Sequence, residues 1–417
     1  MRILFVHQNF PGQYRHLAPA LADSRANEVV AIGEEASLRR LQGFHPRVRL
    51  VAYPQPQGAS RQTHHYLRSS EAAVRRGQSV ARLALELRRH GFVPDVICAH
   101  PAWGEALFLK DVFPTAPLLL YLEFFYRGSG SDVGFDPEFP SSFDDRCRVR
   151  ARNTTQLISL DAGDAGVSPT HWQREQYPDV YRQRIQVIHD GIRSDLVSPG
   201  EVAGFVLPEG RGTLRSGDEV LTYVARNLEP YRGFHTFMRS LPEVLAARPR
   251  VQVLIVGGDE VSYGRPLPGG GTYREHYLRE LGSAIDLGRV HFLGKIPYPR
   301  FIDVLRLSTA HVYLTYPFVL SWSLLEAMSC GCALVASDTA PVREVLRPGH
   351  NGLLVDFFSP AALATTIISV LADPLATQPL RAQARRDIVD HFDLATRTLP
   401  RLLTLVSGLA AEGRPGH

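Results

Sequence analysis

The length, composition and charge of the chain indicate a globular protein with two domains. Its 417 residues exceed what one hydrophobic core accommodates, and 44% hydrophobic with 21% charged residues is an ordinary balance. A net charge of only +4, without a run of like charges, argues against a nucleic-acid partner. Four cysteines without C-x-x-C spacing argue against a zinc site or a disulfide framework, so a reduced, cytoplasmic location is expected.

The amino terminus predicts a short buried strand and no targeting signal. Ile3–Val6 is an apolar run of only four residues, which is too short for the core of a signal peptide. No stretch approaches the roughly 18 uninterrupted apolar residues of a transmembrane helix. We therefore expect at most peripheral contact with a membrane.

The first half of the chain alternates between short apolar runs and amphipathic segments, which is typical of a parallel sheet covered by helices. The apolar positions of Glu71–His90 repeat near the helical period, and Gly91 follows as a C-terminal cap. The predicted strands are Ile3–Val6, Glu28–Ile32, Val48–Ala52, Pro94–His100, Pro117–Leu122, Ala165–Ser168 and Ile185–Ile188, and the predicted helices are Tyr14–Ala22, Glu71–His90, Trp103–Lys110 and Asp144–Ser159.

A segment with few periodic apolar residues divides the chain. We predict an interdomain linker over 194–218, because this segment holds several Gly and Pro residues. The first domain is then expected over 1–193, the second over 219–385, and a C-terminal helix and tail over 386–417. The second series of elements comprises strands Val220–Ala225, Val251–Val256, Val290–Leu293 and Val312–Thr315 and helices Phe234–Ala247, Tyr273–Ala284, Pro299–Ser308 and Pro360–Ala372.

The segment Leu314–Val335 joins a strand to a helix in a way that suits ligand binding. Ser321 and Ser323 are candidate N-cap residues of a helix that carries Glu326 near its start. A helix N-terminus at the carboxyl edge of a parallel sheet is a ready anion site. An ordinary strand–helix–strand unit with an exposed Glu326 explains this segment, taken alone, equally well.

Several motifs follow one another in a characteristic order. Arg226 precedes Arg232-Gly233, and VLIVGG (253–258), HFLGKI (291–296), SLLEAMSCGCALVASDTAPVREVL (323–346) and GHNGLLVD (349–356) come next. The first half contributes the loop FPGQYRHLA (10–18) and the element VIHDGI (187–192). Together these motifs resemble the retaining family-4 nucleotide-sugar glycosyltransferases. The resemblance implies an α/β protein of GT-B fold, with two Rossmann-like doubly wound domains facing a central cleft and a C-terminal helix packing back on the first domain.

The resemblance also implies a donor-binding site. Arg226 and Arg232 match the basic pair that holds the donor diphosphate, where fixed cations stabilise the charge that develops on the leaving group. Glu326 matches the carboxylate that accepts hydrogen bonds from the ribose hydroxyls. A surface ion pair is the alternative for the arginines, and a simple turn is the alternative for the glycine of the first-domain loop. The remaining positions that match donor-binding residues are Gly12, Ile296, Ser321, Trp322 and Ser323.

Phe318 departs from the family pattern. In the family, the first Glu of an E-x7-E motif contacts the hydroxyls of the donor sugar, and Phe318 stands at that position, eight residues before Glu326. The identity of the donor sugar therefore stays open, and so does the assumption that activity is intact.

Two polar residues at strand ends are the candidate catalytic residues. Most family members carry a histidine after a first-domain strand, near the donor sugar; Glu123 follows that strand here, and His100 ends the preceding strand. A buried, hydrogen-bonded structural role is an equal alternative for both. No bound metal is expected, because in retaining GT-B enzymes basic side chains and helix termini do that work.

The leading hypothesis is a retaining glycosyltransferase, such as one of polysaccharide biosynthesis. It would move a hexose-like unit from a UDP- or GDP-sugar to a glycan, lipid-linked or small-molecule acceptor, with no cofactor beyond this co-substrate. One alternative is another GT-B activity, such as a sugar-nucleotide epimerase. A second is a non-catalytic nucleotide-sugar-binding protein, which Phe318 favours. A dinucleotide oxidoreductase is disfavoured, because no G-x-G-x-x-G follows the first strand of either domain.

Overall fold

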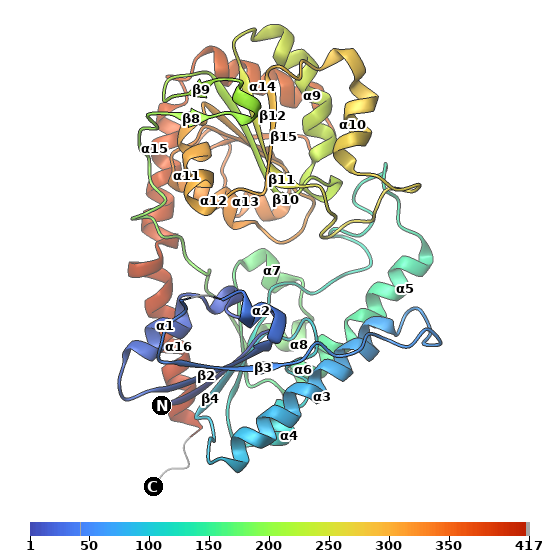
Figure 1. Ribbon diagram of the computed structural model, residues 1–417, viewed down its shortest axis with the longest axis vertical. Coiled ribbons are helices and arrows are strands. Elements are labelled where there is room, and N and C mark those ends of the chain that lie inside the picture. The colour runs from blue at the N-terminus through green and yellow to red at the C-terminus, as the bar shows by residue number, and fades with distance from the viewer. Residues whose placement is uncertain (42, 414–417) are drawn as a thin grey trace. The chain divides into compact units, whose positions relative to one another are not determined.

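The computed structural model describes residues 1–41 and 43–413, and this part of the chain forms two compact units. The first unit contains Met1–Gly191 together with the segment that begins at Ala395. The second unit contains Ile192–Leu394. Figure 1 shows each unit as a sheet with helices on both faces.

The first unit is built on a seven-stranded parallel sheet with the strand order β3-β2-β1-β4-β5-β6-β7. The central strands β1, β4 and β5 are almost entirely apolar and buried, because both faces of the sheet are covered there. The strands are β1 (Arg2–Val6), β2 (Glu28–Glu34), β3 (Val48–Tyr53), β4 (Val96–Ala99), β5 (Leu118–Tyr121), β6 (Ala165–Ser168) and β7 (Ile185–Val187). The helices are η1 (Gly12–Tyr14), α1 (Leu17–Asp23), α2 (Glu35–Arg39), α3 (Arg68–Arg89), α4 (Leu109–Val112), α5 (Phe143–Arg152), α6 (Thr154–Ala162), α7 (His171–Glu175), α8 (Asp179–Arg182) and α16 (Leu399–Glu412).

Two apolar layers cover the faces of this sheet. On one face, Val80 and Leu87 of α3 pack with Leu160 of α6 against alternate residues of the strands. On the other face, α1 and the carboxyl-terminal helix α16 lie together, and Val406 of α16 is fully buried there. The predicted return of the C-terminal helix to the first domain is therefore confirmed.

The second unit is built on a six-stranded parallel sheet with the strand order β12-β11-β10-β13-β14-β15. In Figure 1, α9, α10 and α14 lie on one face of it, and α11, α12 and α15 on the other. The strands of this sheet are β10 (Val220–Asn227), β11 (Gln252–Gly258), β12 (Val290–Gly294), β13 (Ala310–Tyr313), β14 (Leu334–Ser337) and β15 (Leu353–Val355). A separate antiparallel pair is formed by β8 (Phe205–Val206) and β9 (Thr213–Leu214). The helices are η2 (Pro208–Gly210), η3 (Pro230–Arg232), α9 (Phe234–Ala247), α10 (Tyr273–Leu281), η4 (Gly282–Ala284), α11 (Tyr298–Leu307), α12 (Trp322–Ser329), α13 (Ala340–Arg343), α14 (Pro360–Ala372), α15 (Gln378–Asp387) and η5 (Ile388–Phe392); η6 (Leu394–Thr398) lies at the boundary of the two units.

The segment predicted as an interdomain linker lies inside the second unit. Residues 194–218 include the antiparallel pair β8 and β9, and Val197 and Phe205 are buried in the core of this unit. Their few apolar residues are spaced too irregularly to indicate a strand or helix, but those residues still reach the core. The chain therefore passes into the second unit at Ile192.

Two predicted helices differ from the observed ones. The helix expected over Trp103–Lys110 is wrong, since only Leu109–Val112 is helical. Gly104 has φ +108°, and a Cβ atom there would lie 2.2 Å from the carbonyl oxygen of Ala73, so the close approach of α3 replaces the helix by a turn. The helix expected over Asp144–Ser159 is divided into α5 and α6 at Asn153, whose Nδ2 donates to the carbonyl of Tyr126 at 2.6 Å.

Candidate functional site

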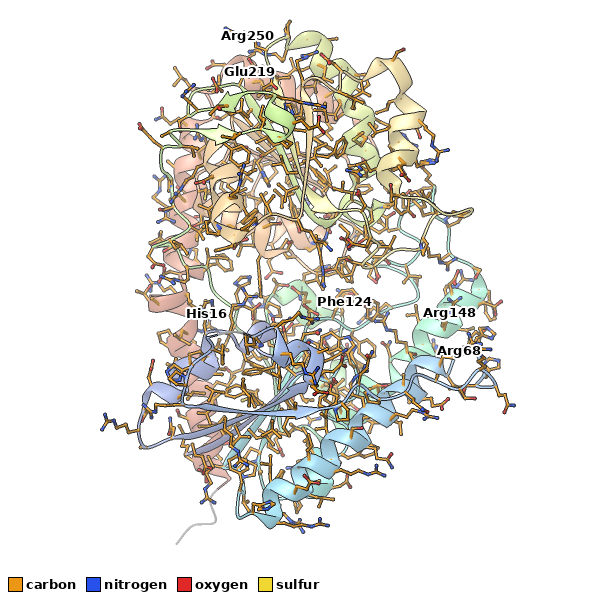
Figure 2. The ribbon with its side chains drawn as sticks, viewed as in Figure 1. His16, Arg68, Phe124, Arg148, Glu219 and Arg250 are labelled. Atoms are coloured by element: carbon orange, nitrogen blue, oxygen red, sulfur yellow. The ribbon has the colours of Figure 1, made fainter. Side chains whose placement is uncertain are left out.

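The sheet of the second unit reverses its strand order between β10 and β13. In open parallel sheets, ligands bind at the carboxyl ends of the strands at such a switch point. Arg226 lies near the end of β10, and the segment after β13 leads to α12. Arg250 and Glu219, labelled in Figure 2, lie at the opposite, amino-terminal ends of β11 and β10.

Arg226 is an exposed cation whose guanidinium is available to a ligand. Within the described residues, its guanidinium has no hydrogen-bond or ion-pair partner. The alternative of a surface ion pair therefore does not hold for this residue. An unpaired guanidinium at the carboxyl edge of a sheet can bind an anion through paired N–H donors.

Arg232 is a buried cation whose protein partners are all neutral. Its side chain is held in η3 with only 6% of the residue exposed. Nη1 donates to the hydroxyl of Tyr313 at 3.2 Å, to that of Thr315 at 2.8 Å and to the carbonyl of Val319 at 3.1 Å. No carboxylate contacts it in the part of the chain that the structure describes. Burying a cation without a counter-charge is costly, so the site favours an anionic ligand.

Phe318 belongs to an aromatic wall beside Arg232. The guanidinium carbon lies 5.4 Å from the ring centroid of Tyr263 and 5.8 Å from that of Phe318, within the range of cation–π attraction. Tyr231 contacts the Phe318 ring edge to face at 5.5 Å. The position that carries a sugar-binding Glu in the family is here 97% buried among aromatic rings, with a relative exposure of 3%.

A buried carboxylate fixes the loop that carries Tyr263. Glu229 is fully buried and accepts backbone N–H groups from Ser262 at 3.0 Å, Tyr263 at 3.1 Å and Gly264 at 2.8 Å. Three N–H donors satisfy this carboxylate in the absence of a cation. Glu229 therefore positions the aromatic wall and is not a counter-ion of the arginines.

The N-terminus of α12 is partly satisfied by the protein. Ser321 is the N-cap residue, and its Oγ accepts from the amide of Ser323 at 3.3 Å. The amide of Ser321 donates to the hydroxyl of Tyr313 at 2.9 Å, the same hydroxyl that Arg232 contacts. The amides of Ser321 and Ser323, two of the three predicted to face phosphates, thus have internal acceptors. Trp322, the third, is half-buried at the first helical position.

Glu326 faces a tyrosine that the sequence did not single out. The hydroxyl of Tyr298 donates to its Oε1 at 2.6 Å. Tyr298 begins α11, two residues after Ile296, which is half-buried against the core of this unit. This hydrogen bond joins the start of α11 to α12. Ile296 and Glu326, the two residues predicted to contact the nucleoside, are therefore carried by segments that this bond links.

The sheet of the first unit has its own switch point, between β1 and β4. His7 follows β1, His100 follows β4 and Glu123 follows β5 at neighbouring strand ends. The rings of His7 and His100 meet edge to face at 5.1 Å. His100 Nε2 lies 3.8 Å from Glu123 Oε2, beyond hydrogen-bonding distance. The two predicted catalytic candidates therefore do come together.

Gln13 links His7 to Glu123, so that His7, Gln13, His100 and Glu123 form one polar cluster. His7 Nδ1 accepts from the amide of Asn9 at 2.9 Å, so the proton of the neutral ring lies on Nε2, 2.8 Å from Gln13 Oε1. Gln13 Nε2 in turn donates to Glu123 Oε1 at 3.1 Å. Burial lowers the pKa of His7 to about 4, despite the opposing hydrogen bond from Gln13. The ring is therefore neutral at pH 7.

His100 is also held neutral. Its Nδ1 accepts from the amide of Ala102 at 3.2 Å, and its Nε2 is buried without a hydrogen-bond partner in the described structure. Burial, with a smaller contribution from His7, lowers its pKa well below the ordinary value. The ring stacks on Trp103 at 4.5 Å and on Tyr121 at 5.6 Å. A fixed neutral imidazole with one unpaired N–H can donate to a substrate hydroxyl or carbonyl.

Gly12 has a structural reason to be glycine. Its φ is +46°, and a Cβ atom there would lie 2.5 Å from Cε1 and Nε2 of His7. A side chain would displace the imidazole. The residue thus shapes the polar cluster directly, whereas its predicted contact with phosphate stays a prediction.

Several residues of these two sites were not identified from the sequence, among them His7, Gln13, Tyr298 and Tyr313. His7 directly follows a predicted strand, which is the signal that selected His100. Gln13, Tyr298 and Tyr313 are recognised only from long-range contacts. Among the described residues, no group of three His, Cys, Asp or Glu side chains could hold a metal ion. None of the helices described has both the length and the apolar character to cross a bilayer.

Two protein-family models match the chain, one on each half. The model of the glycosyl transferase family 4 group matches 25–197, and that of glycosyl transferases group 1 matches 210–387. A D-inositol 3-phosphate glycosyltransferase of Rhodococcus jostii is 29% identical over 206 residues, which are 47% of this chain and 44% of the relative. A phosphatidyl-myo-inositol mannosyltransferase of Mycolicibacterium smegmatis is 34% identical over 216 residues, 50% of each chain. The chain thus spans about half the length of the curated relatives it matches.

Solved structures resemble the whole chain. Sucrose-phosphate synthase of Thermosynechococcus elongatus has a TM-score of 0.73 at 17% identity, covering 99% of this chain and 100% of that one. Anabaena HepE in complex with UDP has a TM-score of 0.65 at 17% identity, covering 98% of this chain and 100% of that one. At this identity the likeness shows the fold, which is GT-B. Because a glycosyl transferase model matches each half and each unit is a Rossmann-like domain of this fold, the chain belongs to the family-4-like glycosyltransferases.

Proposed function

We propose that this protein is a retaining glycosyltransferase that uses a UDP-sugar as its donor. The observation that carries the proposal is the pair Arg226 and Arg232, two cations at the switch point of the second sheet that have no carboxylate partner among the described residues. A diphosphate leaving group gains charge as its bond to the sugar breaks, and fixed guanidinium groups stabilise that charge. UDP and UDP-glucose are bound in the solved structures of Anabaena HepE, which supports uridine as the nucleoside.

In the proposed reaction, an acceptor hydroxyl attacks the anomeric carbon on the face from which UDP leaves. The bond from the anomeric carbon to the diphosphate oxygen breaks as the new glycosidic bond forms. The hydroxyl proton passes to an oxygen of the leaving phosphate, so the product keeps the configuration of the donor. Arg226 and Arg232 stabilise the leaving UDP, and Glu326 accepts hydrogen bonds from the ribose hydroxyls.

In the first unit, we assign Glu123 and His100 to the binding of sugar hydroxyls. The carboxylate of Glu123 accepts hydrogen bonds, and the unpaired Nε2–H of the neutral His100 donates one. No step of the proposed reaction needs a metal ion, since the arginines supply the positive charge.

A thermal-shift screen against UDP-, GDP-, ADP- and dTDP-sugars tests the choice of donor. A ligand that binds only the folded protein raises Tm, so we expect the uridine compounds to give the largest shift. Release of UDP is then measured with and without a panel of hydroxylated acceptors, and NMR of the product reports the anomeric configuration. An inverted product, or a donor with another nucleoside, contradicts the proposal.

Replacement of Arg232 tests its role in catalysis. We expect Arg232→Ala to lower kcat about a hundredfold or more, as when one strong oxyanion donor is lost. Arg232→Lys, which keeps the charge but not the fork of donors, should retain more activity. An unchanged kcat in the alanine variant would refute the assignment.

Phe318 favours a second candidate function, a non-catalytic nucleotide-sugar-binding protein. The carboxylate that contacts the donor sugar in the family is absent, and aromatic rings occupy the position. Calorimetry with UDP-sugars followed by a turnover assay separates the two functions. Binding without any acceptor-dependent release of UDP would favour the binding protein.

A further inference from the structure

The first unit contains a cavity that His7, His100 and Glu123 do not line. The cavity has a volume of about 680 Å³ and lies among the segment 125–129, α5, the start of α6 and the turn before α8. This volume lies in the range of small-molecule sites, roughly 300–1,000 Å³. Neither the family-4 motifs nor the proposed reaction assigns a role to it.

The charged side chains on the cavity wall are all arginines. Arg127, Arg146 and Arg150 line it, and no Asp or Glu is among the described lining residues. Arg127 donates to the backbone carbonyls of Gln176 at 2.9 Å and Glu175 at 3.0 Å. For Arg146 and Arg150, the described part of the chain provides no ion-pair partner. The wall therefore attracts an anion, and no carboxylate of the described chain neutralises the charges of Arg146 and Arg150.

Asn153 provides a second, independent indication of a ligand. It lines the cavity, has only 6% of its surface exposed and donates through Nδ2 to the carbonyl of Tyr126 at 2.6 Å. Its Oδ1 is buried and has no hydrogen-bond partner in the structure described. An unsatisfied buried acceptor is costly, and a ligand with an O–H donor would satisfy it.

Apolar side chains complete the wall. Phe143 is 70% exposed and Leu157 38% exposed, although both are large hydrophobic residues. Gly128 brings the loop backbone against the stem of Arg146, where a Cβ atom would lie 3.3 Å from the arginine Cβ. Apolar and cationic groups thus lie together on the cavity wall.

We propose that this cavity binds a phosphorylated polyol, either free or as the headgroup of a lipid. Arg146 and Arg150 bind the phosphate, because guanidinium groups form paired, charge-assisted hydrogen bonds with its oxygens. A hydroxyl of the polyol donates to Asn153 Oδ1. The C–H face of the polyol packs on Phe143 and Leu157. This binding requires neither a nucleotide sugar nor the proposed transfer reaction.

Cys147 offers a direct measurement of occupancy. It lines the cavity and is partly exposed, whereas Cys98, Cys330 and Cys332 are buried. Alkylation of the full chain by N-ethylmaleimide, followed by mass spectrometry of Cys147, therefore reports access to the cavity. We expect saturating glucose 6-phosphate to slow this alkylation about tenfold, and glucose or inorganic phosphate alone to protect far less, because each satisfies only part of the wall.

Matched variants on α5 separate the site from general electrostatics. The double variant Arg146→Gln/Arg150→Gln should lose the protection and weaken glucose 6-phosphate binding about tenfold or more. Arg148→Gln removes a charge from the same helix but should keep both, because Arg148, labelled in Figure 2, pairs with Asp145 at 2.7 Å and does not line the cavity.

Vesicles distinguish the two sources of the ligand. If phosphatidylinositol vesicles protect Cys147 in an Arg146- and Arg150-dependent way and glucose 6-phosphate does not, the polyol phosphate is a lipid headgroup. If the free compound protects, it is a soluble ligand. Equal protection in the double variant and in Arg148→Gln, or protection by neither ligand, overturns the proposal. A circular-dichroism melt of each variant confirms that the chain remains folded.

Discussion

At the scale of single residues, the two arginines of the second unit differ in how much the fold depends on them. Arg232 holds three neutral acceptors through Nη1, so its removal also disturbs the protein. Arg226 is exposed and holds none within the described structure. Ligand binding and stability are therefore separable at Arg226 and coupled at Arg232.

Arg226→Ala should weaken binding of UDP without weakening the fold. We expect Kd to rise about tenfold or more, since one charge-assisted contact is lost, and the free energy of unfolding to change by less than about 0.5 kcal/mol. Isothermal calorimetry and thermal denaturation measure the two effects. Arg250→Ala, at the amino-terminal edge of the same sheet, removes an equal charge and should leave Kd unchanged (Figure 2). Equal effects from both variants would show that only net charge matters.

The buried His7 predicts that the first unit loses stability in mild acid. Its pKa is about 4 in the folded protein and about 6.5 when unfolded, so between these values the unfolded chain binds a proton that the folded chain does not. Stability is therefore full above pH 6.5 and falls as the pH falls towards 4, by up to about 3 kcal/mol from this group. Denaturant unfolding from pH 7.5 to pH 4.5 measures the slope.

His7→Gln should flatten that slope, because the variant has no imidazole to protonate. It need not abolish the slope, since burial also lowers the pKa values of His100 and His189. The comparison uses the pH dependence and not the absolute stability, which the substitution also changes. An identical slope in the two proteins would contradict the assignment.

At the scale of elements, local signals in the sequence predict the secondary structure of a segment but not the distant residues that form hydrogen bonds with it. The apolar run of β10 and the cap at Ser321 follow from neighbouring residues, and the structure has both. Tyr313, in contrast, lies eight residues before Ser321 on another element, and only the fold brings its hydroxyl to that amide. The same holds for Gln13, which lies 110 residues from Glu123. The sequence therefore predicted the sheets and the strand-end candidates, whereas the hydrogen-bond partners that fix them had to come from the structure.

Tyr313→Phe tests whether this hydroxyl organises the start of α12. It removes an acceptor shared by the amide of Ser321 and by Arg232, so we expect a loss of about 1–3 kcal/mol of stability and a weaker Kd for UDP. Tyr223→Phe is the matched control, because in the described part of the chain that buried hydroxyl donates only to the carbonyl of Arg232. It should cost similar stability with little effect on Kd, as measured by denaturant unfolding and calorimetry. Equal losses of affinity would remove any special role for Tyr313.

At the scale of the whole molecule, the chain enters the second unit once and returns to the first. The return places α16 against α1, where Leu402, Val406 and Ala410 complete an apolar layer that the first 191 residues begin. The hydrophobic core of the first unit is thus complete only when α16, the last helix of the described chain, packs against it. Its stability must depend on residues more than 200 positions away from the rest of its core.

Val406→Ala should therefore destabilise the first unit and leave the second nearly unchanged. Val406 is fully buried, and the loss of its two methyl groups should cost about 1–3 kcal/mol through lost burial and a residual cavity. Hydrogen exchange followed by mass spectrometry resolves the two units, and we expect faster exchange in β1, β4 and α1. Val244→Ala on α9 is the reciprocal control, since Val244 is equally buried in the second unit. This substitution should accelerate exchange in the second unit instead. If both substitutions accelerated exchange over the whole chain, the two units would unfold as one, and the helix would be a part of a single cooperative structure.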